Sequence, residues 1–225
     1  PLEVGSPVST WPDILVGDNR FADDAWQFDE RLCPILVHDT EDRPSVRFDG
    51  WSTYMATNPM PCGNQQTAFI VFAPSPASFS STSHGGMLLK QGVDSPSLEF
   101  AVLENHAPRG QICLQSGVGE TKTTGCVSGP PVKPLVPSAV AFTYDLAAER
   151  AELAVNGKVV ASAPFSTVIE QTSKRYIGSH AQPWYEAYFL GNIYEVIVYD
   201  EVLDDAQRQE VFDYLATRYK LSFNE

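Results

Sequence analysis

The sequence has no run of about 18 apolar residues, the length that a membrane-spanning helix needs. It also has no basic start followed by an apolar stretch, so it does not begin with a secretory signal peptide. We therefore expect no membrane span and interpret Pro1 as a mature end or as a boundary within a longer protein. Internal repeats, low-complexity tracts and linkers are missing too, which favours a single domain over residues 1–225.

Basic residues are scarce. The 225 residues include 15 Lys and Arg against 28 Asp and Glu, which gives a formal net charge of −13. Binding to the phosphate backbone of nucleic acid needs a dense cationic surface, whereas the basic residues here are scattered along the chain. The charge balance therefore argues against a nucleic-acid partner.

Cysteine is sparse as well, with Cys33, Cys62, Cys113 and Cys126. No Cys-x-x-Cys pair and no His at zinc-finger spacing is present, so the sequence does not predict a structural zinc site. Cys113 and Cys126 lie at mirrored positions of an expected hairpin, where they would stand opposite each other and form a disulfide. Cys33 would then pair with Cys62; the alternative is four buried thiols. Oxidised cysteines predict a secreted, periplasmic or surface-exposed protein.

Short runs of alternating apolar residues, separated by turn residues, predict many antiparallel strands. These runs cover residues 45–50, 67–74, 86–92, 97–104, 110–117, 139–145, 151–157, 158–164, 174–179 and 189–200. The dipeptide Asn156-Gly157 is a preferred two-residue hairpin turn, so the strands on either side of it are expected to pair. Many short strands with almost no helix indicate a sandwich or a barrel.

Two segments depart from this pattern. Near the C-terminus, Asp204 and Gln207 have the spacing of a helix N-cap, and apolar residues recur at helical spacing from Phe212 to Tyr219. One helix is therefore predicted there. The segment from Val8 to Arg43 is rich in Asp and Pro and poor in alternation, which predicts long ordered loops.

Three stretches carry a resemblance to a known family. The first stretch combines VSTWPD at 8–13 with RPSVRFDGWSTYM at 43–55. The second is the hairpin AELAVNGKVVAS at 151–162, and the third runs from RYIGS at 175–179 through the predicted helix to residue 221. Together they resemble the LamG-like jelly-roll family, in the concanavalin A-like superfamily that includes laminin G modules and pentraxins. The resemblance covers nearly the whole chain. It implies an all-β, concanavalin-like jelly-roll sandwich of two antiparallel sheets with one C-terminal α-helix.

The same resemblance implies a recognition module for glycans, proteins or lipids, although glycosidases and lyases share the fold. Retaining glycosidases need two carboxylates about 5–5.5 Å apart on one face of a strand. The sequence has no Glu-x-Asp-x-x-Glu motif, and Glu99 and Glu104 fall on opposite faces of a regular strand. Its Tyr, His and Arg residues match no lyase motif, and no catalytic serine or metalloprotease motif is present. The sequence thus favours a binding module over an enzyme.

Aromatic and short polar side chains gather in the loop before the last strand, where they suit stacking on sugar rings and hydrogen bonding to hydroxyls. The candidate ligand-binding residues in this loop are His180, Gln182, Trp184, Tyr185, Glu186 and Tyr188. Trp51 and Tyr54, which follow the strand at 45–50, form a second candidate surface. In both places the alternative is that the rings pack onto the sheet.

Calcium is a candidate structural cofactor because irregular acidic segments supply the oxygen ligands that this ion prefers. The segments contain Asp13, Asp18, Asn19, Asp23, Asp24, Asp39, Glu41 and Asp42. No calcium-loop spacing is present, and the positions that match the pentraxin calcium loop are Ser179, His180, Ala181 and Gln182. No ligand set is therefore assigned.

These observations predict a non-catalytic, lectin-like carbohydrate-binding module of a larger secreted or surface protein, with a glycan or polysaccharide as its partner. Two alternatives stay open. One is a protein–protein or adhesion domain that binds no sugar. The other, which the missing motifs disfavour, is a polysaccharide-degrading enzyme on the same fold.

Overall fold

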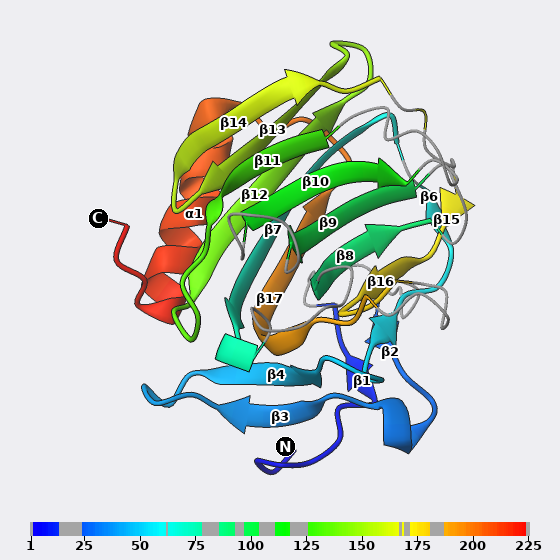
Figure 1. The fold of residues 1–225 in the computed structure, drawn as a ribbon, viewed down its shortest axis with the longest axis vertical. Coiled ribbons are helices and arrows are strands. Elements are labelled where there is room, and N and C mark those ends of the chain that lie inside the picture. The colour runs from blue at the N-terminus through cyan, green and yellow to red at the C-terminus, as the bar shows by residue number, and fades with distance from the viewer. Residues whose placement is uncertain are drawn as a thin grey trace.

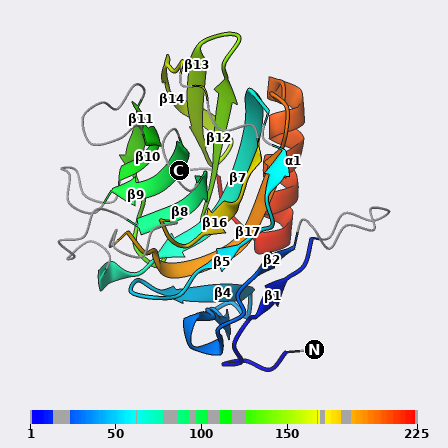
Figure 2. The same ribbon diagram turned by 90° about the vertical axis from the view of Figure 1, so that its right-hand side faces the viewer.

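Two antiparallel sheets pack face to face, and one α-helix covers the outer side of the second sheet (Figure 1). Figure 2 shows the three layers edge on. The computed structural model describes residues 2–13, 24–61, 63–77, 86–92, 97–103, 111–117, 126–166, 168, 172–180 and 187–223. This architecture confirms the predicted concanavalin-like β-sandwich with a single C-terminal helix among the described residues.

The eight-stranded sheet faces the viewer in Figure 1. In spatial order its strands are β1 (Thr10–Trp11), β2 (Ala25–Trp26), β5 (Met55–Ala56), β16 (Arg175–Ile177), β8 (Gly86–Gln91), β9 (Ser97–Leu103), β10 (Gln111–Gly117) and β11 (Cys126–Pro131). Strands far apart in the sequence are neighbours here, because β16 separates β5 from β8.

The seven-stranded sheet forms the second layer. Its order is β14 (Lys158–Pro164), β13 (Arg150–Val155), β12 (Ser138–Asp145), β7 (Gln65–Pro74), β17 (Leu190–Tyr199), β4 (Pro44–Asp49) and β3 (Ile35–His38). Two further short strands, β6 (Met60–Pro61) and β15 (Thr172–Ser173), pair with each other. The predicted hairpin at Asn156-Gly157 joins β13 to β14, and both turn residues have positive φ, as such a turn requires.

Two hydrophobic cores lie on the two sides of the seven-stranded sheet, and β7 contributes to both. Its residues Ile70 and Phe72 point into the core between the sheets, while Phe69 and Val71 point into the core under the helix. Because both faces of β7 are covered, its sequence is a continuous apolar run instead of an alternation.

The helix α1 (Asp205–Tyr219) has Asp204 as its N-cap, as predicted. The Asp204 side chain accepts a hydrogen bond from the Gln207 backbone, and the Gln207 side chain accepts one from the Asp204 backbone. Phe212, with Leu215, is buried against the sheet, and its ring meets that of Phe69 edge to face at 5.2 Å. The helix therefore closes the second core, and the eight-stranded sheet keeps an outer face that no helix covers within the described residues.

The prediction of long loops from Val8 to Arg43 is wrong in part. The described residues of this segment include β1, β2, β3 and the short 3₁₀ helix η1 (Glu30–Leu32). These elements are too short to give a clear alternation in sequence, and their pairing partners come from other segments: β3 pairs with β4, and β2 with β5. They extend both sheets at the lower end of the molecule in Figure 1.

Candidate functional site

A row of polar side chains crosses the outer face of the eight-stranded sheet. Strand register places Tyr176 opposite Lys90, Lys90 opposite Glu99, and Glu99 opposite Gln115. Their neighbours in sequence are buried in the core between the sheets: Ile177, Leu89, Leu98, Phe100 and Leu114. Because side chains alternate along a strand, the four residues of this outer row point away from the core.

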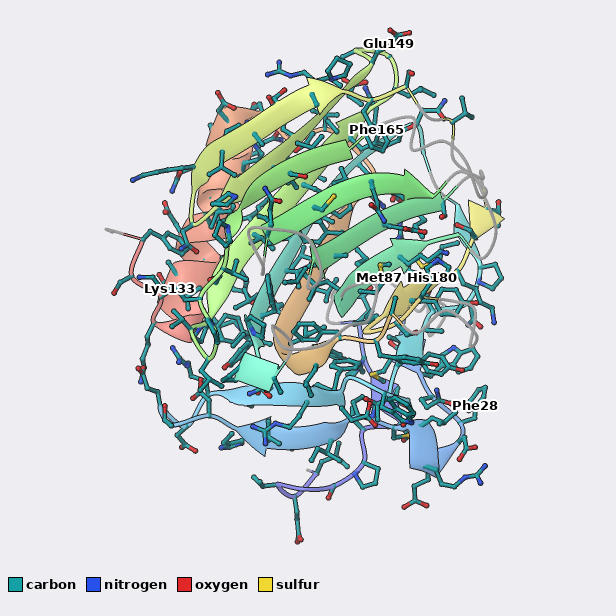
Figure 3. All side chains as sticks on the ribbon, in the orientation of Figure 1. Phe28, Met87, Lys133, Glu149, Phe165 and His180 are labelled. Atoms are coloured by element: carbon teal, nitrogen blue, oxygen red, sulfur yellow. The ribbon has the colours of Figure 1, made fainter. Side chains whose placement is uncertain are left out.

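An ion-paired cluster occupies the middle of the outer row, where His180 reaches in from the segment after β16. The Lys90 Nζ atom lies 2.6 Å from His180 Nε2 and 3.3 Å from Glu99 Oε1, and His180 Nε2 lies 3.2 Å from the same Glu99 oxygen. Lys90 is 2% exposed, Glu99 6% and His180 9%. Figure 3 labels His180 and Met87 of β8 in the right-hand half of the molecule. Burial of these polar and charged groups is tolerable because each has a partner.

The carboxylate of Glu99 is fully engaged by hydrogen-bond donors. Ser97 Oγ donates to Oε1 at 3.1 Å, and Gln115 Nε2 donates to Oε2 at 2.9 Å. Burial alone would raise the pKa of Glu99. The hydrogen bond from His180, the charge of Lys90 and the bond from Gln115 outweigh burial and lower the pKa to about 2. Glu99 is therefore an anion at neutral pH and anchors the cluster electrostatically.

Half-buried tyrosines border this cluster. The rings of Tyr54 and Tyr176 lie 6.5 Å apart, and Tyr188 forms an isolated β-bridge with Ser179, next to His180. Burial raises the pKa of Tyr188, and electrostatic interaction with Tyr54 and Asp49 adds to the effect. These residues come from three separate parts of the chain, so the fold gathers aromatic rings and a polar cluster on one surface.

The structure brings together three of the predicted ligand-binding residues, namely His180, Tyr188 and Tyr54. Trp51 is 76% exposed in the turn after β4, where the Asp49 carboxylate accepts the Trp51 backbone N–H at 2.8 Å. The predicted residues Gln182, Trp184, Tyr185 and Glu186 lie outside the described residues. Whether any of the eight binds a ligand stays a prediction.

Sequence reasoning missed most of the outer row. It considered Glu99 only as half of a carboxylate pair, and Glu104 lies outside the described residues. A charged Lys90 in the apolar run GMLLKQ, and Glu99 between Leu98 and Phe100, were the available signals. A charge in mid-strand marks the face opposite the core, but its partners depend on strand register.

The cysteine predictions need correction. Register places Cys113 opposite Ser128 and Cys126 opposite Gln115, so the two cysteines are not directly opposed, because the hairpin is centred one residue later than the mirrored motif suggests. Cys33 is a free, buried thiol that donates to the Gln27 carbonyl at 3.5 Å, and its expected bond to Cys62 is not formed; Cys62 lies outside the described residues. Within the described part of the chain there is no disulfide.

The described residues contain no group of three or more His, Cys, Asp or Glu side chains that could hold a metal ion. Of the acidic candidates, Asp39 is engaged by Arg43 and Tyr194, and residues 18, 19 and 23 lie outside the described residues. No described helix is long and apolar enough to cross a membrane.

Comparison with known proteins gave a family match and several similar folds. The model of a family described as the concanavalin A-like lectin/glucanases superfamily matches residues 61–207. A search of curated proteins found no match. Domain 4 of AbnA, a GH43 extracellular arabinanase from Geobacillus stearothermophilus, solved with arabinotriose, superposes with a TM-score of 0.60 at 15% identity, covering 79% of this chain and 80% of that one.

Two other solved structures extend the comparison. The CBM40 of the IT-sialidase from Ruminococcus gnavus, bound to α2,3-sialyllactose, has a TM-score of 0.53 and 20% identity over 67% of this chain and 83% of that one. A heptameric SAP-like pentraxin from Limulus polyphemus has a TM-score of 0.56 and 14% identity over 75% and 81%, respectively. At these identities the likeness shows a shared fold.

Proposed function

Because the chain belongs to the concanavalin A-like lectin/glucanases superfamily, we propose that it is a non-catalytic carbohydrate-binding module. The glycan would lie on the outer face of the eight-stranded sheet, against Tyr54, Tyr176 and Tyr188. Two of the similar folds, the arabinanase domain and the sialidase module, were solved with oligosaccharides bound. These two structures support the proposal at the level of the fold.

One observation carries the proposal: half-buried tyrosine rings stand beside a rigid polar cluster on a sheet face that no described helix covers. Sugar recognition needs flat apolar surface for the C–H faces and fixed polar groups for the hydroxyls. Tyr54 and Tyr176 supply the first, and Gln115, half-buried and tied to Glu99, supplies the second. The surrounding hydrogen bonds hold these groups in place before a ligand arrives, which lowers the entropy cost of binding.

The chemistry of Glu99 supports binding over hydrolysis. A glycosidase acid must hold a proton near neutral pH, whereas the pKa of Glu99 is about 2 because its donors outweigh the effect of burial. In a retaining glycosidase, the partner carboxylate would have to occupy an adjacent position on the same face. Those positions hold Lys90, Gln115, Ser97 and Ala101.

Charge favours a neutral glycan as the ligand. Lys90 and the ring of His180, the basic side chains of this cluster, already contact Glu99. The whole chain carries a net charge of −13, which repels anionic polymers at low salt. A uronate or sialate ligand would therefore have no uncompensated cation to bind in this cluster. We further propose an extracellular, periplasmic or surface location within a larger protein, as for domain 4 of the extracellular arabinanase, which has a similar fold.

The test is a binding screen of the purified chain against neutral and acidic polysaccharides, including arabinan, in parallel with calcium and with a chelator. Saturable binding without release of reducing ends supports a binding module. Loss of binding in chelator would support the calcium site that the sequence suggests. Release of reducing ends would identify an enzyme, and absence of binding to every glycan would favour the adhesion alternative.

Variants locate the site. We expect Tyr176→Ala to weaken glycan binding by about tenfold, since one stacking surface of about 1–1.5 kcal/mol is lost, while Tyr176→Phe keeps the ring and the affinity. Tyr214→Ala is the matched control because Tyr214 is 40% exposed on α1, on the other side of the molecule. Unchanged affinity in Tyr176→Ala would rule out this surface, and Trp184→Ala would then test the loop that precedes Tyr188.

A further inference from the structure

Phe28 is the most exposed large hydrophobic side chain in the described part of the chain, at 83%. It follows β2 at the edge of the eight-stranded sheet, and Figure 3 shows it at the lower right of the molecule, on the same side as His180. Packing does not account for this position, because a core role would bury the ring. An exposed aromatic ring that is held in a fixed position offers a flat surface on which a ligand can stack.

Trp26 supports the ring of Phe28 from behind. The two rings are stacked, with centroids 4.1 Å apart and planes 23° from parallel. The Lys174 Nζ atom lies 5.2 Å from the centroid of the Trp26 ring. Both Phe28 and the ammonium group thus contact the Trp26 ring. The more accessible stacking surface is the ring of Phe28, which is 83% exposed.

The backbone around Phe28 is fixed on both sides. The Gln27 backbone donates to the Ser9 carbonyl at 2.9 Å, and the Gln27 side chain accepts from the Asp29 backbone at 3.1 Å. The Asp29 carboxylate in turn caps η1 by accepting from the Arg31 backbone. Phe28 is thus held between two anchored residues, so a ligand would not have to order this segment.

A cavity of about 360 Å³ adjoins the Phe28 ring. Its lining combines apolar Leu2 and Pro7 with hydrogen-bonding groups from Ser6, Ser9, Gln27 and Glu30. This volume is at the lower end of the range for small-ligand sites. One ring for stacking, with serine hydroxyls and a carboxylate beside it, suits a neutral sugar. A stable protein partner would need about 800 Å² on each side, so this ring and cavity would form only part of such an interface.

We propose that Phe28 forms a second sugar-stacking subsite, which makes the ligand a neutral glycan chain that runs from the Tyr54–Tyr176 surface to the edge of the sheet. This inference rests on the proposed function. The two surfaces are physically connected, since the Gln27 side chain donates to the Tyr54 carbonyl at 3.3 Å and Trp26 is opposite Ala56, which is opposite Tyr176. The two strand spacings from β2 to β16 are about 10 Å in total, so only an oligosaccharide reaches both surfaces.

The test is calorimetric titration of the whole chain with ladders of linear oligosaccharides prepared from arabinan, xylan and cellulose, from the disaccharide upward. We expect affinity in the wild type to rise with chain length until both surfaces are occupied. Phe28→Ala should lower the affinity for the longest bound members by about five- to tenfold and leave the shortest bound member unchanged. Phe28→Tyr should restore the length dependence. Leu135→Ala, at a residue that is 69% exposed, is the control for loss of a surface apolar group.

The outcomes separate the two proposals. If the wild type binds a ladder and Phe28→Ala weakens all lengths equally or not at all, the Phe28 subsite is refuted while the carbohydrate-binding function stands. If Tyr176→Ala has no effect but Phe28→Ala abolishes binding of short members, Phe28 is the main site, and the proposed order of the two surfaces is wrong. If the wild type binds no member of any ladder, both proposals fail.

Discussion

Replacing Glu99 by Gln tests the ion-paired cluster most directly. The variant keeps the shape of the side chain but removes its charge, leaving Lys90 buried without its carboxylate partner. It also turns one acceptor oxygen into an amide donor that faces other donors, including Gln115 Nε2. Breaking a buried ion pair by removing one partner typically costs about 3–5 kcal/mol.

The pKa of Glu99 gives an independent magnitude. Its pKa is lowered from 4.5 to about 2, because the His180 bond, the Lys90 charge and the Gln115 bond outweigh burial. A depressed carboxyl pKa stabilises the folded protein above the unfolded value and loses this effect as pH falls through the folded value. At about 1.4 kcal/mol for each pH unit between the two values, the charge contributes about 3 kcal/mol at neutral pH. Both figures amount to a few kcal/mol.

The assay is urea denaturation of wild type and Glu99→Gln from about pH 7 down to about pH 3. We expect the variant to be less stable by about 3 kcal/mol near neutrality and the difference to shrink steadily below about pH 4.5, where protonation of Glu99 begins in the unfolded chain. Glu210→Gln, at an exposed helix position, is the control and should show no such trend. A difference that is near zero at neutral pH, or that stays constant down to about pH 3, would refute the cluster's role.

Two further predictions concern the scaffold. Gly178→Ala should lower the free energy of unfolding by about 3 kcal/mol or more, because φ at this position is +83° and an added Cβ would overlap the Phe48 ring; thermal unfolding that matches the wild type would contradict this. Asp204→Ala should cost about 1 kcal/mol by removing the helix cap, with Asp204→Ser close to wild type in the same melts; equal losses in both variants would exclude a capping effect.

The fold was predictable because its signals are local. Short apolar runs between turn residues located the long strands, Asn156-Gly157 marked a hairpin, and Asp204 with Gln207 marked the helix start, all of which the structure confirms. The short strands β1 and β2 escaped because two residues cannot show a period. The predicted pairing of Cys113 with Cys126 was wrong because the hairpin turn lies one residue later than expected. The symmetry of the sequence does not specify the position of the turn.

The candidate site was predictable only in outline, because its contacts are not local. The loop after β16 pointed to His180 and Tyr188, but the partners of His180 come from β8 and β9, which lie 90 and 81 residues away in the sequence. Ion pairs and ring contacts between strands cannot be predicted from the sequence before the strand order is known. The charge in mid-strand at Lys90 was the strongest overlooked signal.

The two aromatic surfaces are held by different means, and this difference bears on how a ligand would be recognised. Tyr176 stands in the outer row opposite the buried Lys90, so its position depends on the ion-paired cluster to which Lys90 belongs. Phe28 rests on Trp26 and on the bonds of Gln27 at the sheet edge, independent of the ion-paired cluster. Loss of the Glu99 charge should therefore disturb the Tyr176 surface before the Phe28 surface. In a destabilised but folded variant, long glycans would then lose affinity at one end of the site only, which distinguishes two connected subsites from a single continuous groove.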